Sequence, residues 1–172
     1  MGLTAKETGS GSFDPVPEGM HHAVCYGLYD LGTQYNEKFN KNVHQVLLVW
    51  ELPDERISVE KEGEKKELLR SISKKYTLSL HEKAGLRKEL EAWRGKSFTP
   101  EELQGFNLQA LLKANCTLQV IHKHKNDKTY ANIQSIVPLM KNMPKKPPEP
   151  NNPPSIQSGA IDRCGYANAR SL

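Results

Sequence analysis

The sequence predicts a mainly β fold with some helix (α+β), built as one domain with polar ends. Three observations lead to this prediction. Five short segments are rich in β-branched and aromatic residues. One amphipathic segment lies between the third and the fourth of them, and Pro, Gly, Ser and Asn gather at the two ends. The chain has 172 residues, enough for one domain of about 100–150 residues with tails.

The first two predicted strands are His22–Asp30 and Val43–Leu52, separated by a polar segment over residues 32–42. The first is too short and too glycine-interrupted for a helix, and the second is the strongest strand signal in the chain. We expect Pro53 to end the second strand, because proline cannot donate a hydrogen bond to a sheet. Residues 54–67 hold six acidic and four basic residues and are predicted to form a long loop or a hairpin tip.

The third predicted strand, Ser71–Leu80, alternates between apolar and polar residues. Ile72, Tyr76 and Leu78 share one parity and are expected to point inward. Lys75 has the other parity. It is therefore expected to point outward, toward solvent.

The helix is predicted over His81–Arg94, where Leu86, Leu90 and Trp93 recur at the spacing of one helix face. Gly95 stands at the position of a C-cap. We therefore expect this helix to pack one apolar face on the sheet.

A second, short helix is predicted to begin at Thr99–Glu102, which has an N-cap residue, Pro at N1 and Glu at N3. A further turn is expected over Leu108–Leu112. The last two strands are predicted over Cys116–His122 and Tyr130–Val137, joined by a polar hairpin loop over residues 123–128.

Three strands, a helix and two more strands is the element order of an OB-fold, a partly open five-stranded barrel that binds oligonucleotides and oligosaccharides. We therefore expect an OB-like barrel over residues 16–141, with a helix between strands three and four. A flexible segment over residues 1–15 precedes it, and a Pro-rich disordered tail over residues 142–172 follows it.

Composition argues against several classes of protein. No run approaches the ~18 apolar residues of a membrane span, and the polar N-terminus contains no apolar signal segment, so a cytoplasmic protein is expected. Cys25, Cys116 and Cys164 lack the spacing of a disulfide framework or a zinc site, and Cys25 and Cys116 are expected in the core. The net charge of +4 permits binding to a polyanion without requiring it.

Five stretches carry a family resemblance. They are Asp30–Gln34, Val49–Pro53, Ser73–Leu80, Leu86–Gly95 and Tyr130–Ile133. Together they resemble a family of phage replication and recombination proteins described as single-stranded DNA-binding-like. The resemblance covers about residues 16 to 140. It implies an OB fold, single-stranded DNA as ligand, and co-action with a phage recombinase, annealing protein or helicase in the host cell cytoplasm.

One departure from single-stranded DNA-binding proteins concerns the C-terminus. Many such proteins recruit partners through an acidic tail, but residues 147–172 contain only Glu149 and Asp162 as acids. Recruitment through an acidic tail is therefore not supported.

Binding of single strands without sequence preference needs a cationic groove for the phosphates and aromatic rings for the bases. OB-folds bind ligands on the face of strands two and three, between the loops that join strands one to two and four to five. These loops, strand three and the start of strand five supply the candidate residues. They are Tyr35, Phe39, Lys41, Arg70, Lys75, Lys123, Lys125, Lys128 and Tyr130.

Each candidate also has a structural interpretation. Any one lysine or arginine is an ordinary solvated charge unless it contacts a ligand. Tyr35 and Phe39 are compatible with stacking or with packing inside their loop. Trp50 and Trp93 are expected in the core, because each lies on a face predicted to be buried.

Neither a catalytic centre, a metal site nor a cofactor is predicted. His122, His124 and Asp127 match no zinc pattern, and the sequence has no phosphate loop, nucleophile elbow or HExxH motif. The alternative to DNA binding is an OB-like phage adaptor that binds protein and not DNA. A small metal nuclease is a third hypothesis, which requires metal-dependent cleavage. Homo-oligomerisation and the choice between DNA and RNA are left open.

Overall fold

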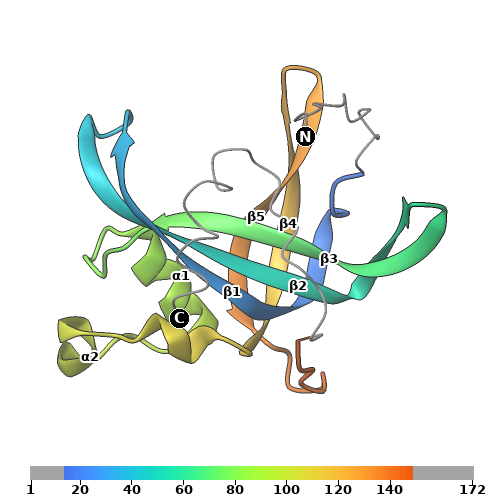
Figure 1. The fold of residues 1–172 in the computed structure, drawn as a ribbon. Coiled ribbons are helices and arrows are strands. Elements are labelled where there is room, and N and C mark those ends of the chain that lie inside the picture. The colour runs from blue at the N-terminus through green and yellow to red at the C-terminus, as the bar shows by residue number, and fades with distance from the viewer. Residues whose placement is uncertain (1–13, 149–172) are drawn as a thin grey trace, which may run out of the picture.

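The computed structural model describes residues 14–148, which form one five-stranded antiparallel sheet with a short helical segment between the third and fourth strands (Figure 1). The order of strands in the sheet is β3-β2-β1-β4-β5. The mainly β class is therefore confirmed. The elements are β1 (Gly19–Asn36), β2 (Lys41–Lys61), β3 (Glu64–Thr77), α1 (Gly85–Arg94), α2 (Pro100–Gln104), the 3-10 helix η1 (Leu108–Leu111), β4 (Asn115–Lys125) and β5 (Lys128–Pro138).

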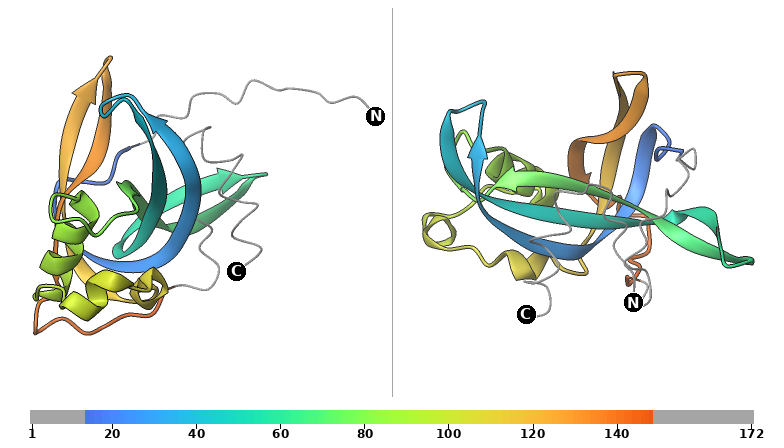
Figure 2. Two further views of the ribbon diagram at one scale, coloured as in Figure 1. Left: turned by 90° about the vertical axis from the view of Figure 1, so that its left-hand side faces the viewer. Right: turned by 45° about the horizontal axis from the view of Figure 1, so that its top comes forward.

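The long strand β1 organises the sheet. Its first residues pair with β4, and its remainder pairs with β2. The register with β2 shifts between Cys25 and Gly27 and again between Asp30 and Gly32, and such bulges bend a strand and increase its twist. As a result β1 and β2 curve together in an arc, as the left view of Figure 2 shows.

The curvature brings the two edge strands, β3 and β5, close together. The ammonium group of Lys74 on β3 donates to the backbone carbonyl of Ile133 on β5 at 3.3 Å. It also pairs with the carboxylate of Glu89 on α1, which accepts a further hydrogen bond from the hydroxyl of Tyr76. A polar side-chain network therefore links the edges of the sheet to the helix beneath them.

Pro53 does not end the second strand, and that prediction is wrong. The register between β2 and β3 shifts between Leu52 and Arg56, so the proline lies in a bulge where a ladder hydrogen bond is not required of it. Beyond the bulge the two strands pair as far as Lys61 and Glu64. The charged segment 54–67 is thus the end of a long hairpin, one of the two forms expected for it.

The third strand lies earlier in the chain than expected. It ends at Thr77, so Ile72 and Tyr76 are buried as predicted, but Leu78 is 41% exposed. The inward position predicted for Leu78 is wrong because the residue follows the strand, where its N–H donates to the carbonyl of His44 at 2.8 Å.

The helical predictions are confirmed in their main features. The first helix begins at Gly85 rather than at His81, buries Leu86, Leu90 and Trp93, and ends at Gly95 in the left-handed conformation (φ 68°). Thr99 and Glu102 form the reciprocal capping box at the start of α2. The expected turn after it is η1.

The main core lies between α1 and the inner face of the curved sheet. Trp50 and Trp93 are both buried, with ring centroids 6.0 Å apart, which confirms the prediction for both tryptophans. Cys25 and Cys116 are free, fully buried thiols in the same cluster, also as predicted. Burial raises the pKa of the Cys25 thiol to about 12, so it stays protonated at neutral pH.

The segment after β5 returns to the sheet. The backbone N–H of Lys146 donates to the side-chain oxygen of Asn115 at 2.9 Å, and the amide of Asn115 donates back to the carbonyl of Lys146 at 3.0 Å. The Lys146 ammonium group pairs with Asp54 at 2.6 Å. The expected disordered tail began at residue 142, and for residues 142–148 that expectation is wrong, because Lys146 is hydrogen-bonded to the sheet. The rest of the tail, residues 149–172, and residues 1–13 of the expected flexible start lie outside the described residues.

Candidate nucleic-acid interface

The hairpins β1–β2 and β4–β5 carry most of the candidate residues. Their two turns point upward in Figure 1 and in the left view of Figure 2, whereas α1 and α2 lie lower in both views. No helix within residues 14–148 is long and apolar enough to span a membrane.

The β4–β5 hairpin gathers three lysines and a tyrosine on one face. Lys123 lies directly opposite Tyr130, and Lys125 lies directly opposite Lys128, so all four side chains leave the ribbon on the same side. This is the outer side, because the neighbouring positions of the other parity, Val120 and Ile133, lie in the core. We call Lys123, Lys125, Lys128 and Tyr130 the lysine face.

The lysine face is open to solvent. Its four residues are exposed, Tyr130 to 49%. Within residues 14–148, none of its three lysines forms an ion pair. The strands continue further than predicted, so only Asn126 and Asp127 form the turn, both with positive φ (51° and 58°) as in a tight hairpin turn.

The lysine face is electrostatically unfavourable without a ligand. Like charges directly opposite each other destabilise a strand pair, and Lys125 and Lys128 are such a pair. An anion placed between them relieves this repulsion. The geometry therefore suits phosphate groups, with a tyrosine ring at the next paired position.

The β1–β2 hairpin presents two aromatic rings at its end. Tyr35 is 59% exposed and Phe39 is 56% exposed, so neither ring packs in the core. The ammonium groups of Lys38 and Lys41 lie 5.6 Å and 6.0 Å from the centroid of the Phe39 ring, within reach of a cation–π interaction. The Tyr35 hydroxyl donates to the side chain of Asn40 across the turn.

Hydrogen bonds to Asp30 fix the base of this hairpin. The Asp30 carboxylate accepts from the Gly32 N–H at 2.7 Å and contacts His44 Nε2 at 2.5 Å. The pKa of Asp30 lies below the ordinary value of an aspartate. The hydrogen bond from the Gly32 N–H is the larger cause, and the hydrogen bond with His44 is the second. These bonds lie at the second bulge of β1 and link it to β2.

The remaining two candidates differ from each other. Lys75 is exposed on the outer face, next to Lys74, whose side chain crosses to β5. Arg70 is instead occupied at the N-terminal side of the domain, where its guanidinium donates to the carbonyls of Asp14 (2.7 Å) and Pro15 (3.2 Å). The structure therefore gives Arg70 a structural role and does not place it with the lysine face.

Two tyrosines that the sequence analysis did not select lie on the outer face of the sheet. Tyr26 and Tyr29 pack on a second apolar cluster formed by Leu31, Leu47 and Val49. The unbroken apolar run from Val46 to Trp50 is the sequence signal for this cluster, since a strand buried on both faces does not alternate.

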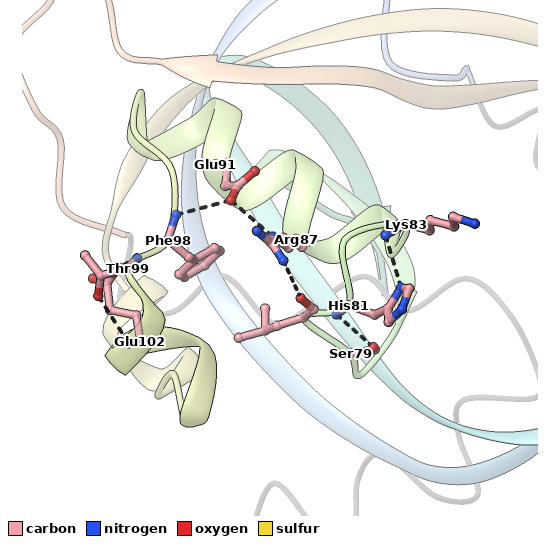
Figure 3. A network of polar contacts seen from close by, with 9 residues as sticks. Ser79, His81, Lys83, Arg87, Glu91, Phe98, Thr99 and Glu102 are labelled. Carbon is pink, nitrogen blue, oxygen red and sulfur yellow. Dashed lines mark hydrogen bonds and ion pairs between the residues drawn. The ribbon is translucent and has the colours of Figure 1, made fainter.

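A separate network of polar contacts holds α1 and the segments on either side of it (Figure 3). Arg87 donates to the carbonyl of Leu80 at 3.3 Å and to Glu91 at 3.2 Å. Glu91 accepts the backbone N–H of Phe98 at 3.1 Å, the main cause of its lowered pKa. The network keeps the helix in place on the side of the sheet away from the two hairpin turns.

The described part of the chain shows no arrangement suited to a metal ion. Within residues 14–148, no group of three or more His, Cys, Asp or Glu side chains is placed to hold one. Comparison with known proteins adds no family: no protein-family model, no curated protein and no solved structure matches the chain.

Proposed function

We propose that the protein binds single-stranded DNA, largely without sequence preference and without catalysis, during phage replication or recombination. The observation that carries the proposal is the lysine face, where Lys125 and Lys128 oppose each other and Tyr130 opposes Lys123. Phosphates neutralise such a face, and aromatic rings stack on unpaired bases whatever their identity.

The topology supports an OB-like barrel as the framework. The antiparallel order β3-β2-β1-β4-β5, a helix between β3 and β4, and edge strands joined through Lys74 are the features expected of a partly open five-stranded barrel. In such barrels the loops between strands one and two and between strands four and five flank the ligand. These loops correspond here to the turn with Phe39 and the turn next to the lysine face.

The proposed partners follow from the resemblance in the sequence. A recombinase, an annealing protein or a helicase acts on the same single strands in the host cytoplasm. Recruitment through an acidic tail does not form part of the proposal, because residues 149–172 contain only two acids.

A salt-titrated binding assay tests the proposal. Fluorescence anisotropy of a labelled oligo-dT should report binding at low salt, with an affinity that falls linearly on a log–log plot by about 0.7 units per phosphate engaged. A duplex of the same length should bind more weakly, since its bases are not free to stack. Absence of oligo-dT binding at low salt would overturn the proposal in favour of the adaptor alternative.

A further inference from the structure

The outer face of the sheet continues from the lysine face toward the start of β1. Met20 on β1 lies directly opposite Gln119 on β4, so a third strand joins the β4–β5 hairpin at this point. Figure 1 shows the start of β1 beside that hairpin. The outward-facing pairs beyond the lysine face are Ile121 with Asn132, Gln119 with Ser135, and Met20 with Gln119.

These side chains point away from the core. Val120 and Ile133 have the other parity and belong to the main core. The hydroxyl of Ser135 donates to the side-chain oxygen of Gln119 at 3.1 Å, which places both side chains on the same side of the two strands. Met20 and Gln119 are exposed. The outer face is therefore open where β1 meets β4.

Three apolar side chains form a diagonal across this face. Tyr130 lies on β5, Ile121 on β4 at the next pair, and Met20 on β1 at the pair after that. Diagonal neighbours on a sheet are about 7–8 Å apart, which is about twice the 3.4 Å rise per nucleotide of a strand in B-DNA. The spacing therefore suits a strand whose bases are unstacked and spread apart. We call Tyr130, Ile121 and Met20 the apolar stripe.

Charge favours an anionic strand along the apolar stripe. Neither β4 nor β5 contains an acidic residue. Glu18, which precedes β1, already accepts the backbone N–H of His122 at 2.6 Å. A nucleic-acid backbone that follows these strands therefore meets the three cations of the lysine face and no carboxylate from β4 or β5.

Polar groups beside the stripe can complete the contacts. Asn132 donates to the carbonyl of Tyr130 at 3.3 Å. The side-chain oxygen of Gln119 accepts from Ser135, and its amide nitrogen has no hydrogen-bond partner among residues 14–148. This nitrogen is thus free to donate to an oxygen of a base or of a phosphate.

The face of strands two and three, where an OB-fold is expected to bind its ligand, has less open apolar surface. Leu47 on β2 is only 2% exposed, and Tyr26 and Tyr29 pack against the cluster to which it belongs. Met20 and Tyr130, by contrast, are 54% and 49% exposed. The open apolar side chains therefore lie on β1, β4 and β5.

We propose that the single strand runs along the apolar stripe, with one base on each of Tyr130, Ile121 and Met20 and its phosphates against the lysine face. This inference rests on the proposed function and specifies a path along β5, β4 and β1, not across β2 and β3. A tyrosine ring stacks on any base, and a methionine thioether contacts aromatic rings favourably. The Gln119 amide donates to the strand at the Met20 end.

Methyl NMR of methionine tests this path in the full-length protein. The chain has four methionines, so selective ¹³C labelling of their methyl groups gives few signals, and Met20→Ala assigns the signal of Met20. Addition of oligo-dT at low salt should shift this signal upfield, because a base stacked on the methyl group exerts a ring current. Met140, which is 56% exposed in the segment after β5, is the internal control and should not shift.

The anisotropy assay distinguishes failure of the path from failure of the proposed function. If oligo-dT binds but the Met20 signal stays in place, the strand follows another path and only the present inference is overturned. Equal shifts at Met20 and Met140 would overturn it as well. If oligo-dT does not bind at low salt, both the path and the proposed function are overturned.

Substitutions along the stripe should weaken binding without a change in salt slope, because no phosphate contact is lost. Met20→Ala should weaken oligo-dT binding about three-fold, within the range of a methionine–aromatic contact. Tyr130→Ala should weaken it about five-fold. Met140→Ala removes a methionine of similar exposure and is the matched control, with unchanged affinity expected. If Met20→Ala binds as tightly as Met140→Ala, Met20 does not contact the strand and the path is wrong.

Discussion

The hairpins β1–β2 and β4–β5 both carry lysines and exposed aromatic rings, but they treat the positive charge differently. In the β1–β2 hairpin, Lys38 and Lys41 lie near the ring of Phe39 in the same turn. In the β4–β5 hairpin, Lys125 and Lys128 oppose each other, and neither has an acidic partner among residues 14–148. The lysines of the β1–β2 hairpin thus lie next to an aromatic ring of their own turn, whereas Lys125 and Lys128 of the β4–β5 hairpin face each other.

This difference indicates that the two hairpins would contribute differently to DNA binding. A cation that already lies against a ring gains less from a phosphate than a cation that faces another cation. We therefore expect the β4–β5 hairpin to dominate the salt-dependent part of DNA binding. The β1–β2 hairpin should contribute mainly through base stacking, which releases no counterions.

The largest expected effect comes from removal of the lysine face. Replacement of Lys123, Lys125 and Lys128 together by Ala should lower the log–log salt slope of oligo-dT binding by about two units, at about 0.7 per lost phosphate contact. At 0.1 M salt this corresponds to about 100-fold weaker binding. Anisotropy titrations at several salt concentrations measure both quantities.

The chain offers a matched control for this variant. Lys83, Lys88 and Lys96 are also exposed, but they lie on or beside α1, away from the two turns. Their replacement by Ala removes the same net charge and should change the slope little. If the two triple variants weaken binding equally, overall charge and not the lysine face governs binding.

The next effect should come from the aromatic end of β1–β2. Phe39→Ala removes a stacking surface and should weaken oligo-dT binding by about 1 kcal/mol, or about five-fold, with nearly the same salt slope. Tyr35→Ala should behave in the same way. A clear fall in slope for either variant would mean that these rings position the neighbouring lysines on phosphates, contrary to the division proposed here.

A charge reversal in the lysine face should separate stability from binding. Lys125→Glu places a carboxylate opposite Lys128 and should stabilise the hairpin by about 0.2–1 kcal/mol. The same change should weaken DNA binding. Urea unfolding measures the effect on stability, and anisotropy measures the effect on binding. A destabilised variant would show that repulsion between Lys125 and Lys128 does not weaken the hairpin in the free protein.

Much of the fold could be predicted from local patterns. The helix with Leu86, Leu90 and Trp93 and the capping box at Thr99 depend on residues close in sequence, and both are present. Strand ends were harder to predict. From the sequence alone, Pro53 predicts the end of a strand. The bulge that accommodates it depends on the pairing of β2 with β3, which no local pattern shows.

The candidate site could be predicted in part for a similar reason. Alternation along a hairpin identifies Lys123, Lys125, Lys128 and Tyr130 as exposed, but their common face depends on the register across the turn. The engagement of Arg70 with Asp14 joins residues 56 positions apart, and no local pattern reveals it. Tyr26 and Tyr29 were missed because their place on the outer face follows from the bulges of β1.

The smallest predicted effect concerns Asp30 at the base of the β1–β2 hairpin. Its lowered pKa means that its carboxylate is favoured in the folded state, so the stabilisation is present above the unfolded-state pKa and is lost as pH falls through the lower, folded-state pKa. An NMR titration should place the Asp30 pKa below the ordinary value of 3.8. Because the Gly32 N–H is the larger cause, His44→Gln should raise this pKa only in part, whereas a full return to the ordinary value would make the histidine the principal partner.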